Sequence, residues 1–203
     1  MTLQTFSDVD LLRLMMAGEE DAFAELYNRR QAGVYKFALQ MSGSRETAED
    51  VTQEVFIVLM RTADRFDPER GSLAAYLYGI ARNYVLRRLE QDRAFIPIVD
   101  SIEEGTPPAM IVEGNPLDDL TRGETIQSLR DSILALPPHY REVIVLCELH
   151  EMSYLEAASV VGCAVGTVRS RLHRARGLLV ERLRAARERS SVRQEVKPAR
   201  CFA

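Results

Sequence analysis

The fold of the carboxyl-terminal half is decided by residues 153–176, which read SYLEAASVVGCAVGTVRSRLHRAR. Ser153 and Glu156 have the spacing of a capping box, in which each side chain satisfies a backbone amide at the start of a helix. Gly162 can adopt the left-handed conformation that commonly ends a helix. A second helical pattern starts at residue 165. This order of signals predicts a helix-turn-helix.

The second helix of this pair has two chemically different sides. At 100° per residue, Val168, Leu172, Ala175 and Leu179 form an apolar stripe that we expect to face the core. The opposite side carries Gly166 and groups that suit base edges, and its flanks carry arginines that suit phosphates. An Arg-rich helix by itself is usually a solvated face, but the capped partner helix favours binding in a DNA groove. The base-edge candidates are Ser170, His173 and Arg174, and the phosphate candidates are Arg169, Arg171 and Arg176. Thr167, on the same side as the base-edge candidates, is a further candidate for DNA binding.

The charge is segregated along the chain. The 203 residues include 26 Lys and Arg against 30 Asp and Glu, for a net charge of −4. Residues 165–189 nevertheless hold eight arginines and two acids, whereas residues 99–125 hold seven acids and one base. The overall charge is therefore a poor guide to whether the chain binds nucleic acid.

The acidic stretch divides the chain. Helix breakers are dense there, at Pro97, Gly105, Pro107, Pro108, Gly114 and Pro116, so we interpret it as a linker. Apolar residues recur with helical spacing on both sides, and no long stretch alternates with period two. The sequence predicts an all-α fold of two small helical domains joined by an acidic, Pro-containing linker. The expected boundaries are a first domain over 1–95, a linker over 96–123, a second domain over 124–187 and a disordered tail over 188–203.

The second domain resembles region 4 of bacterial sigma factors of the sigma-70 family, extracytoplasmic-function (ECF) type. The resemblance rests on LPPHYREVIVL at 136–146 and on GTVRSRLHRAR at 166–176. It implies that the second helix reads the −35 promoter element as duplex DNA and that this region docks on the flap of the polymerase β subunit. Ala164 stands where many relatives have Ser, which removes an expected N-cap worth about 1 kcal/mol.

The first domain resembles sigma region 2 through AEDVTQEVF at 48–56. Helical spacing places Thr47, Asp50, Gln53 and Glu54 on one polar ridge beside an apolar stripe. From composition alone this ridge could be an ordinary solvated face. The resemblance implies that Asp50, Gln53 and Glu54 bind the coiled coil of the polymerase β′ clamp.

Residues 64–88 combine a polar loop, DRFDPERGS at 64–72, with the helical stretch AAYLYGIARNYVLRR at 74–88. Extruded bases need an aromatic face, hydrogen-bond partners and nearby cations, and this segment contains all three. The resemblance implies that it holds the melted −10 strand. For any one aromatic here, core filling is the commoner role, and Tyr76 stands where relatives usually have Trp. The −10 candidates are Phe66, Asp67, Arg70, Ser72, Tyr76, Arg82, Asn83, Arg87 and Arg88.

The sequence gives little support for a catalytic site or a metal site. Cys147 and His150 lie one helical turn apart, with Cys163 and His173 following, so a zinc site is compatible with the spacing. Core cysteines and solvent-facing histidines are the favoured interpretation. No glycine-rich phosphate loop and no Ser/His/Asp order is present. We expect no enzyme activity, no cofactor and no metal.

The sequence as a whole predicts a promoter-specificity subunit that binds core RNA polymerase and promoter DNA. Two alternatives are a repressor that uses only the helix-turn-helix and a helical adaptor that binds proteins alone. The resemblance to ECF sigma factors also implies an anti-sigma factor as a partner. No apolar run is long enough to span a membrane and the amino terminus does not resemble a signal peptide, so we expect a cytoplasmic protein without membrane insertion. The acidic linker is either a solvated tether or a nucleic-acid mimic in a basic polymerase channel.

Overall fold

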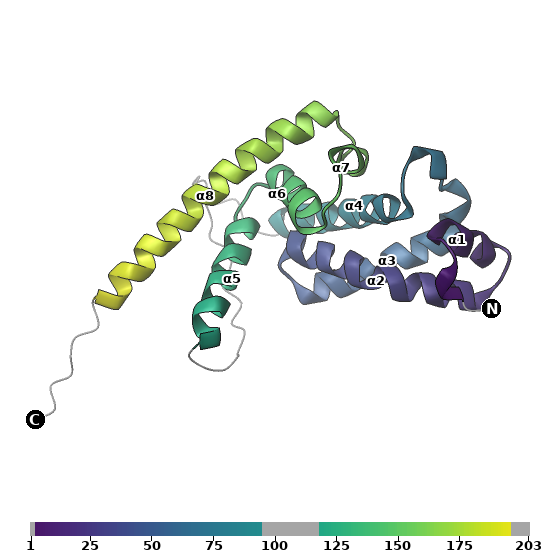
Figure 1. Cartoon of the computed structure of the whole chain (residues 1–203), viewed down its shortest axis with the longest axis horizontal. Coiled ribbons are helices and arrows are strands. Elements are labelled where there is room, and N and C mark those ends of the chain that lie inside the picture. The colour runs from purple at the N-terminus through teal and green to yellow at the C-terminus, as the bar shows by residue number, and fades with distance from the viewer. Residues whose placement is uncertain (1–2, 95–117, 196–203) are drawn as a thin grey trace, which may run out of the picture.

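The structure is a computed structural model of the whole chain, and it describes residues 3–94 and 118–195. These two ranges are called here the amino-terminal half and the carboxyl-terminal half (Figure 1). Both are helical, and no strand occurs in either range, which confirms the predicted all-α class. No helix in these ranges is long and apolar enough to cross a membrane.

The amino-terminal half is a bundle of four helices around one apolar core. Its helices are α1 (Asp8–Met16), α2 (Glu20–Ser42), α3 (Arg45–Thr62) and α4 (Leu73–Ala94), with short 3-10 turns at Leu3–Thr5, Ala63–Arg65 and Pro68–Arg70. Gly43 ends α2 in the left-handed conformation, at φ 75°. Ser44 then caps α3 by accepting a hydrogen bond from the Thr47 amide at 3.2 Å. The tight turn between these helices brings their apolar faces together.

The carboxyl-terminal half contains α5 (Asp118–Leu134), α6 (Pro138–Ile144), a π-helical turn at Val145–Leu149, α7 (Tyr154–Val161) and α8 (Val165–Glu195). In Figure 1, α8 starts beside α7 at the top and runs away from the bundle toward the lower left. The helices α6, α7 and the first part of α8 enclose the core of this half, around Val143, Leu146 and Leu172.

Two boundaries differ from those expected. The helix α5 begins at Asp118, inside the expected linker, because all the prolines of that linker precede residue 118. The helix α8 continues to Glu195, inside the segment expected to be disordered, since no Pro or Gly interrupts residues 178–195. The rest of the linker and tail, and with them the mimicry hypothesis, lie outside the described residues.

The two halves pack against each other. The helix α7 lies against α4, while α5, α6 and the π-helical turn contact α2. The core is continuous across this contact, which we call the closed interface. It brings together residues that sequence reasoning had placed in separate domains.

Candidate nucleic-acid interface

The helix-turn-helix has the predicted local geometry. The Glu156 amide donates to Ser153 Oγ at 3.2 Å, and the Ser153 amide donates to Glu156 Oε2 at 3.0 Å, so the capping box is complete. The bonds from Ser153 hold the pKa of Glu156 below its ordinary value. Gly162 ends α7 at φ 73°, in the left-handed region. These two devices fix where α8 begins relative to α7.

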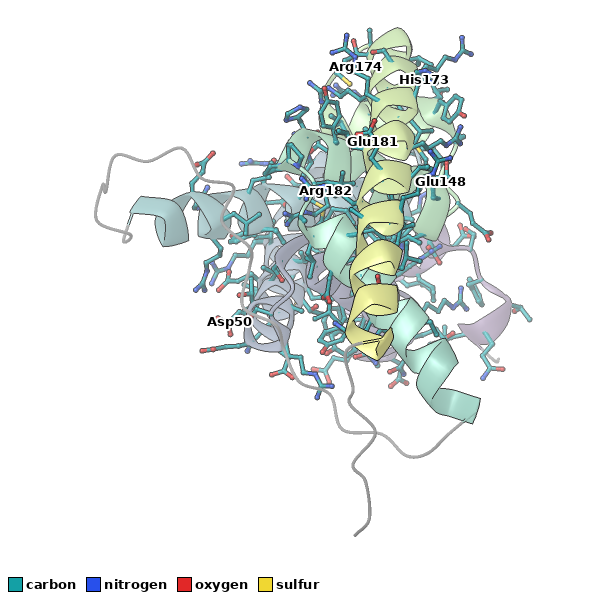
Figure 2. All side chains as sticks on the ribbon, turned by 90° about the vertical axis from the view of Figure 1, so that its left-hand side faces the viewer. Asp50, Glu148, His173, Arg174, Glu181 and Arg182 are labelled. Carbon is teal, nitrogen blue, oxygen red and sulfur yellow. The ribbon has the colours of Figure 1, made fainter. Side chains whose placement is uncertain are left out.

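The helix α8 is divided as its spacing predicts. Val168, Leu172 and Ala175 are buried, and Leu179 is half-buried against the core. Gly166, Ser170, His173 and Arg174 are exposed, whereas Thr167 is half-buried. Figure 2 shows His173 and Arg174 near the start of α8, pointing outward on different sides of the helix. Ser170 Oγ donates to the Thr167 carbonyl at 3.0 Å, which leaves its lone pairs as acceptors.

The three arginines on the flanks of α8 all have partners within the chain. Arg171 Nη1 lies 3.1 Å from Glu142 Oε1, and Arg176 Nη2 lies 2.5 Å from Glu148 Oε1. The Arg169 guanidinium lies 5.9 Å from the centre of the Tyr154 ring, within reach of a cation–π contact. Phosphate binding by Arg171 or Arg176 therefore requires an exchange of carboxylate for phosphate.

The polar ridge on α3 forms as expected. Val51 and Val55 are buried on the core side, while Gln53 is exposed and Asp50 and Glu54 are half-buried. Asp50 is not free of partners, because its Oδ2 lies 3.1 Å from Arg88 Nη2 on α4. The ridge that sequence reasoning assigned to polymerase is thus joined to an arginine assigned to DNA.

The loop before α4 is held by its own polar side chains. Asp67 Oδ1 accepts from the Glu69 amide at 3.0 Å, and Ser72 Oγ accepts from the Ala75 amide at 3.2 Å. The Phe66 and Tyr76 rings pack with centres 5.6 Å apart, and both are half-buried. Arg70, which lies between Phe66 and Tyr76 in the sequence, is exposed. The loop is held in shape by these bonds, and its Phe66 ring shares one cluster with Tyr76 of α4.

The polar residues of α4 have different surroundings. Asn83, Arg87 and Arg88 are exposed, with the Arg87 guanidinium 5.6 Å from the centre of the Tyr84 ring. Arg82, in contrast, is largely covered, and its Nε donates to Glu142 Oε2 at 2.7 Å. Four of the arginines assigned to DNA thus form ion pairs inside the chain: Arg82, Arg88, Arg171 and Arg176.

Sequence reasoning missed the residues that join the halves. Tyr78 and His150 form a hydrogen bond of 2.9 Å, and His150 Nε2 lies 2.9 Å from Gln40 Oε1. Burial, and secondarily Lys36, lowers the pKa of His150 to about 4. Arg141 donates to the carbonyls of Met41 and Leu134. The one available signal was the pair of charged residues at 141–142 at the start of an apolar run, because charges are buried only when paired.

The prediction of solvent-facing histidines is wrong for His150. The chain continues from α6 into a π-helical turn, closed by the bond from the His150 amide to the Val145 carbonyl at 3.0 Å. The His150 ring follows this turn and packs against Tyr78 and Phe37 of the amino-terminal half, so the contact between the halves covers it. Cys147 and Cys163 are half-buried, and burial raises the pKa of Cys147. Within the described ranges, no cluster of three or more His, Cys, Asp or Glu side chains could hold a metal ion.

Each half of the chain matches a known protein family. The family Sigma-70 region 2 matches residues 26–95, and the family Sigma-70, region 4 matches residues 126–179. The ECF RNA polymerase sigma factor SigW of Bacillus subtilis is 32% identical over 178 residues, covering 85% of this chain and 95% of that protein. The chain belongs to the ECF sigma factors. It is therefore a member of a family of non-catalytic subunits that act in transcription initiation, with a DNA-binding region 4.

Solved structures agree with this family. This ECF sigma factor matches CnrH, solved in complex with the cytosolic domain of CnrY, with TM-score 0.62 and 26% identity over 88% of this chain and 97% of that one. It also matches the sigma factor RpoE of Bartonella quintana, solved with the anti-sigma factor NepR, with TM-score 0.62 and 26% identity over 80% and 96% of the chains. From here the halves are called region 2 and region 4.

Proposed function

We propose that this ECF sigma factor binds core RNA polymerase, reads the −35 element as duplex DNA with α8, and holds the melted −10 strand with residues 64–88. The observation that carries the proposal is the exposed pair His173 and Arg174 at the start of a helix whose other face is locked into the core. A helix presented in this way fits the major groove and reaches base edges without rearrangement.

In the −35 interface, Arg174 is the strongest candidate for a base contact. A guanidinium can donate two parallel hydrogen bonds to guanine, and Arg174 has no ion-pair partner among the described residues. His173, Ser170 and Thr167 contribute shorter polar contacts beside it. The phosphate contacts come from Arg169, Arg171 and Arg176, which fix the position of the helix on the duplex.

In the −10 interface, the loop before α4 and the exposed side of α4 act together. Phe66 and Tyr76 offer the aromatic face for an extruded base, and Asp67 and Ser72 keep the loop in shape. Arg70 lies at the rim. The single strand then follows α4, where the backbone and bases are held by Arg82, Asn83, Arg87 and Arg88.

The polymerase contacts supply the affinity that neither region has alone. Asp50, Gln53 and Glu54 bind the β′ clamp, and region 4 docks on the β flap. Two contacts with one large partner make the second one intramolecular, which raises its effective concentration. The acidic ridge mainly speeds and orients the encounter.

An anti-sigma factor and a cytoplasmic location complete the proposal. The match to a sigma factor solved with the anti-sigma factor NepR supports an inhibitor of this kind for the present chain. The polymerase that it serves is cytoplasmic, and we expect the protein there without membrane insertion or enzyme activity.

Transcription by purified core polymerase on a random promoter library tests the proposal. With the chain added, we expect initiation at templates that share two sequence blocks, and without it none. Arg174→Ala should weaken selection within the −35 block, while Arg184→Ala, the same change ten residues further along α8, should leave it intact. Initiation that does not depend on the chain contradicts the proposal. A chain that binds DNA but not polymerase supports a repressor, and one that binds only protein supports an adaptor.

A further inference from the structure

The loop assigned to the −10 base is closed at its stem by two hydroxyl groups. Thr62 is the last residue of α3, and Tyr76 lies near the start of α4. Thr62 Oγ1 and Tyr76 Oη lie 3.1 Å apart, although the two residues are 14 positions apart in the sequence. Tyr76 is a candidate for DNA binding, whereas nothing in the sequence singles out Thr62. Both residues belong to region 2, so their contact does not depend on region 4.

The direction of this hydrogen bond follows from the protons that are available. A threonine hydroxyl has one proton, and Thr62 donates it to the Val58 carbonyl, one helical turn earlier, at 2.9 Å. Tyr76 Oη therefore donates to Thr62 Oγ1, which still has lone pairs to accept. The Val58 carbonyl is part of α3. The two bonds in series thus tie the Tyr76 ring to the backbone of α3.

The Tyr76 ring in turn supports Phe66, the aromatic residue of the loop. The two ring centres lie 5.6 Å apart and the ring planes are inclined by 60°, which is typical of favourable aromatic pairs. Asp67 and Ser72 accept hydrogen bonds from backbone amides, so they fix the backbone of the loop. The bond between Thr62 and Tyr76 acts instead on the ring against which Phe66 packs.

We infer that Thr62 is a positioning residue for −10 recognition. Its hydroxyl fixes Tyr76, and Tyr76 fixes the place of Phe66, where the extruded base stacks. Thr62 itself touches no base. Binding is stronger when the aromatic face is already in place, because ordering side chains during binding costs free energy. The inference rests on the proposed function, since it requires that this loop holds the base.

Thr62→Val tests the inference because valine has nearly the shape of threonine but no hydroxyl. Thr52→Val is the matched control. Thr52 lies in the same helix and donates to the Ala48 carbonyl at 2.7 Å, the same bond to the preceding turn, but it bonds to no tyrosine. Both variants lose a bond to the backbone of α3, and only Thr62→Val releases Tyr76. Thr62→Ser keeps the hydroxyl and should behave as the wild type.

Trypsin digestion of the full-length free chain measures the loop without DNA or polymerase. Arg65 and Arg70 are exposed within the loop, and mass spectrometry identifies cleavage after each of them. Losing one hydrogen bond should make this cleavage about 3- to 10-fold faster in Thr62→Val. Tyr76→Phe removes the same bond from its other end and should be equally fast, which keeps the test valid if Thr62→Val does not fold. An unchanged rate in the folded variants, or equal acceleration by Thr52→Val, overturns the inference.

Transcription by core polymerase gives the second readout. The templates are a selected promoter and versions with single changes in either the −10 or the −35 block. Thr62→Val should lower discrimination among −10 blocks about 3- to 10-fold and leave discrimination among −35 blocks unchanged. Combining it with Tyr76→Phe should add little, because both changes remove one bond. Equal loss on both blocks shows a merely structural role and overturns the inference.

The proposed function and the role of Thr62 fail in different ways. If the wild-type chain directs no initiation by core polymerase, the proposed function fails, while trypsin digestion still decides whether Thr62 holds the loop. If the wild type initiates and Thr62→Val selects −10 blocks as the wild type does, only the role of Thr62 is overturned.

Discussion

The two surfaces assigned to DNA differ in how much of each the closed chain covers. On α8, His173 and Arg174 are exposed, and the flanking arginines sit at the edges of the face. On α4, Arg82 is largely covered by the contact with region 4, and Ser72 bonds to α7. The base-edge groups of the duplex-reading face are thus exposed in the free chain, although Arg171 and Arg176 beside them are paired with carboxylates. The single-strand face is partly covered. This difference suits the order of events at a promoter, since duplex DNA exists before a melted strand does.

We expect the largest effect from a substitution in the buried stripe of α8, because this stripe anchors the helix that carries the exposed face. Leu172→Ala deletes a side chain that is 2% exposed on the buried side of α8. Such a cavity costs about 2 to 5 kcal/mol, a large part of the stability of a small domain. Thermal unfolding followed by circular dichroism should show region 4 destabilised. Leu155→Ala, at a side chain that is 72% exposed, is the control and should stay within about 0.5 kcal/mol. Equal losses would show that α8 is not anchored as described.

The next effect concerns the exposed face itself. Arg174→Ala should weaken binding to a selected −35 duplex by about 1 to 3 kcal/mol and relax the choice of base at one position. Arg176→Ala should weaken binding to all duplexes alike, and less strongly, because Arg176 must first leave Glu148. Fluorescence anisotropy with matched and mismatched duplexes separates the two. Uniform loss with Arg174→Ala would place it on phosphate instead.

The covered surface should respond to pH through His150. Its pKa is about 4 when packed against Tyr78 and near Lys36, and about 6.5 when open to water. Between these values the open or unfolded chain binds a proton that the closed chain does not, so the closed state is favoured above pH 6.5 and weakens as the pH falls toward 4. Small-angle X-ray scattering at pH 7.5, 6 and 5 should show gradual expansion. The variant His150→Gln lacks the titrating imidazole, so its scattering should change less with pH. A pH profile identical to that of the wild type would exclude His150 as the source of the expansion.

What could be predicted from the sequence depended on how far apart in the chain the interacting residues lie. Capping by Ser153 and Glu156, the turn at Gly162 and the buried stripe of α8 follow rules that act within a few residues, and the structure confirms them. The Arg82–Glu142 pair joins residues 60 positions apart, and nothing local distinguishes it. His150 was misplaced because its partners Tyr78 and Gln40 lie 72 and 110 positions away in the sequence. The assignments of single residues to DNA and polymerase stay predictions.

A smaller effect tests a local rule at the start of the reading helix. Ala164 precedes α8, and its carbonyl accepts from the amides of Thr167 and Val168, but its side chain has no acceptor. Ala164→Ser should add an N-cap and raise the free energy of unfolding by about 0.5 to 1 kcal/mol. Denaturant unfolding measures the gain. Ser159→Ala, at an exposed position inside α7, removes a hydroxyl that caps nothing and serves as a reference for hydroxyl effects. No gain from Ala164→Ser would mean that the α8 start is already satisfied.

The smallest effect is expected where the polymerase ridge meets the DNA surface. Asp50 pairs with Arg88, but both side chains are 48% exposed, so the pair contributes little to stability. Asp50→Asn should slow capture by core polymerase about 3-fold at low salt, because complementary charge mainly sets the association rate. The same change frees Arg88 and should slightly strengthen binding of single-stranded DNA. Glu49→Gln, next to it on α3 but outside the ridge, controls for the lost charge. If both variants slow capture equally, the ridge acts through net charge alone, and the residue-specific contact with the clamp is wrong.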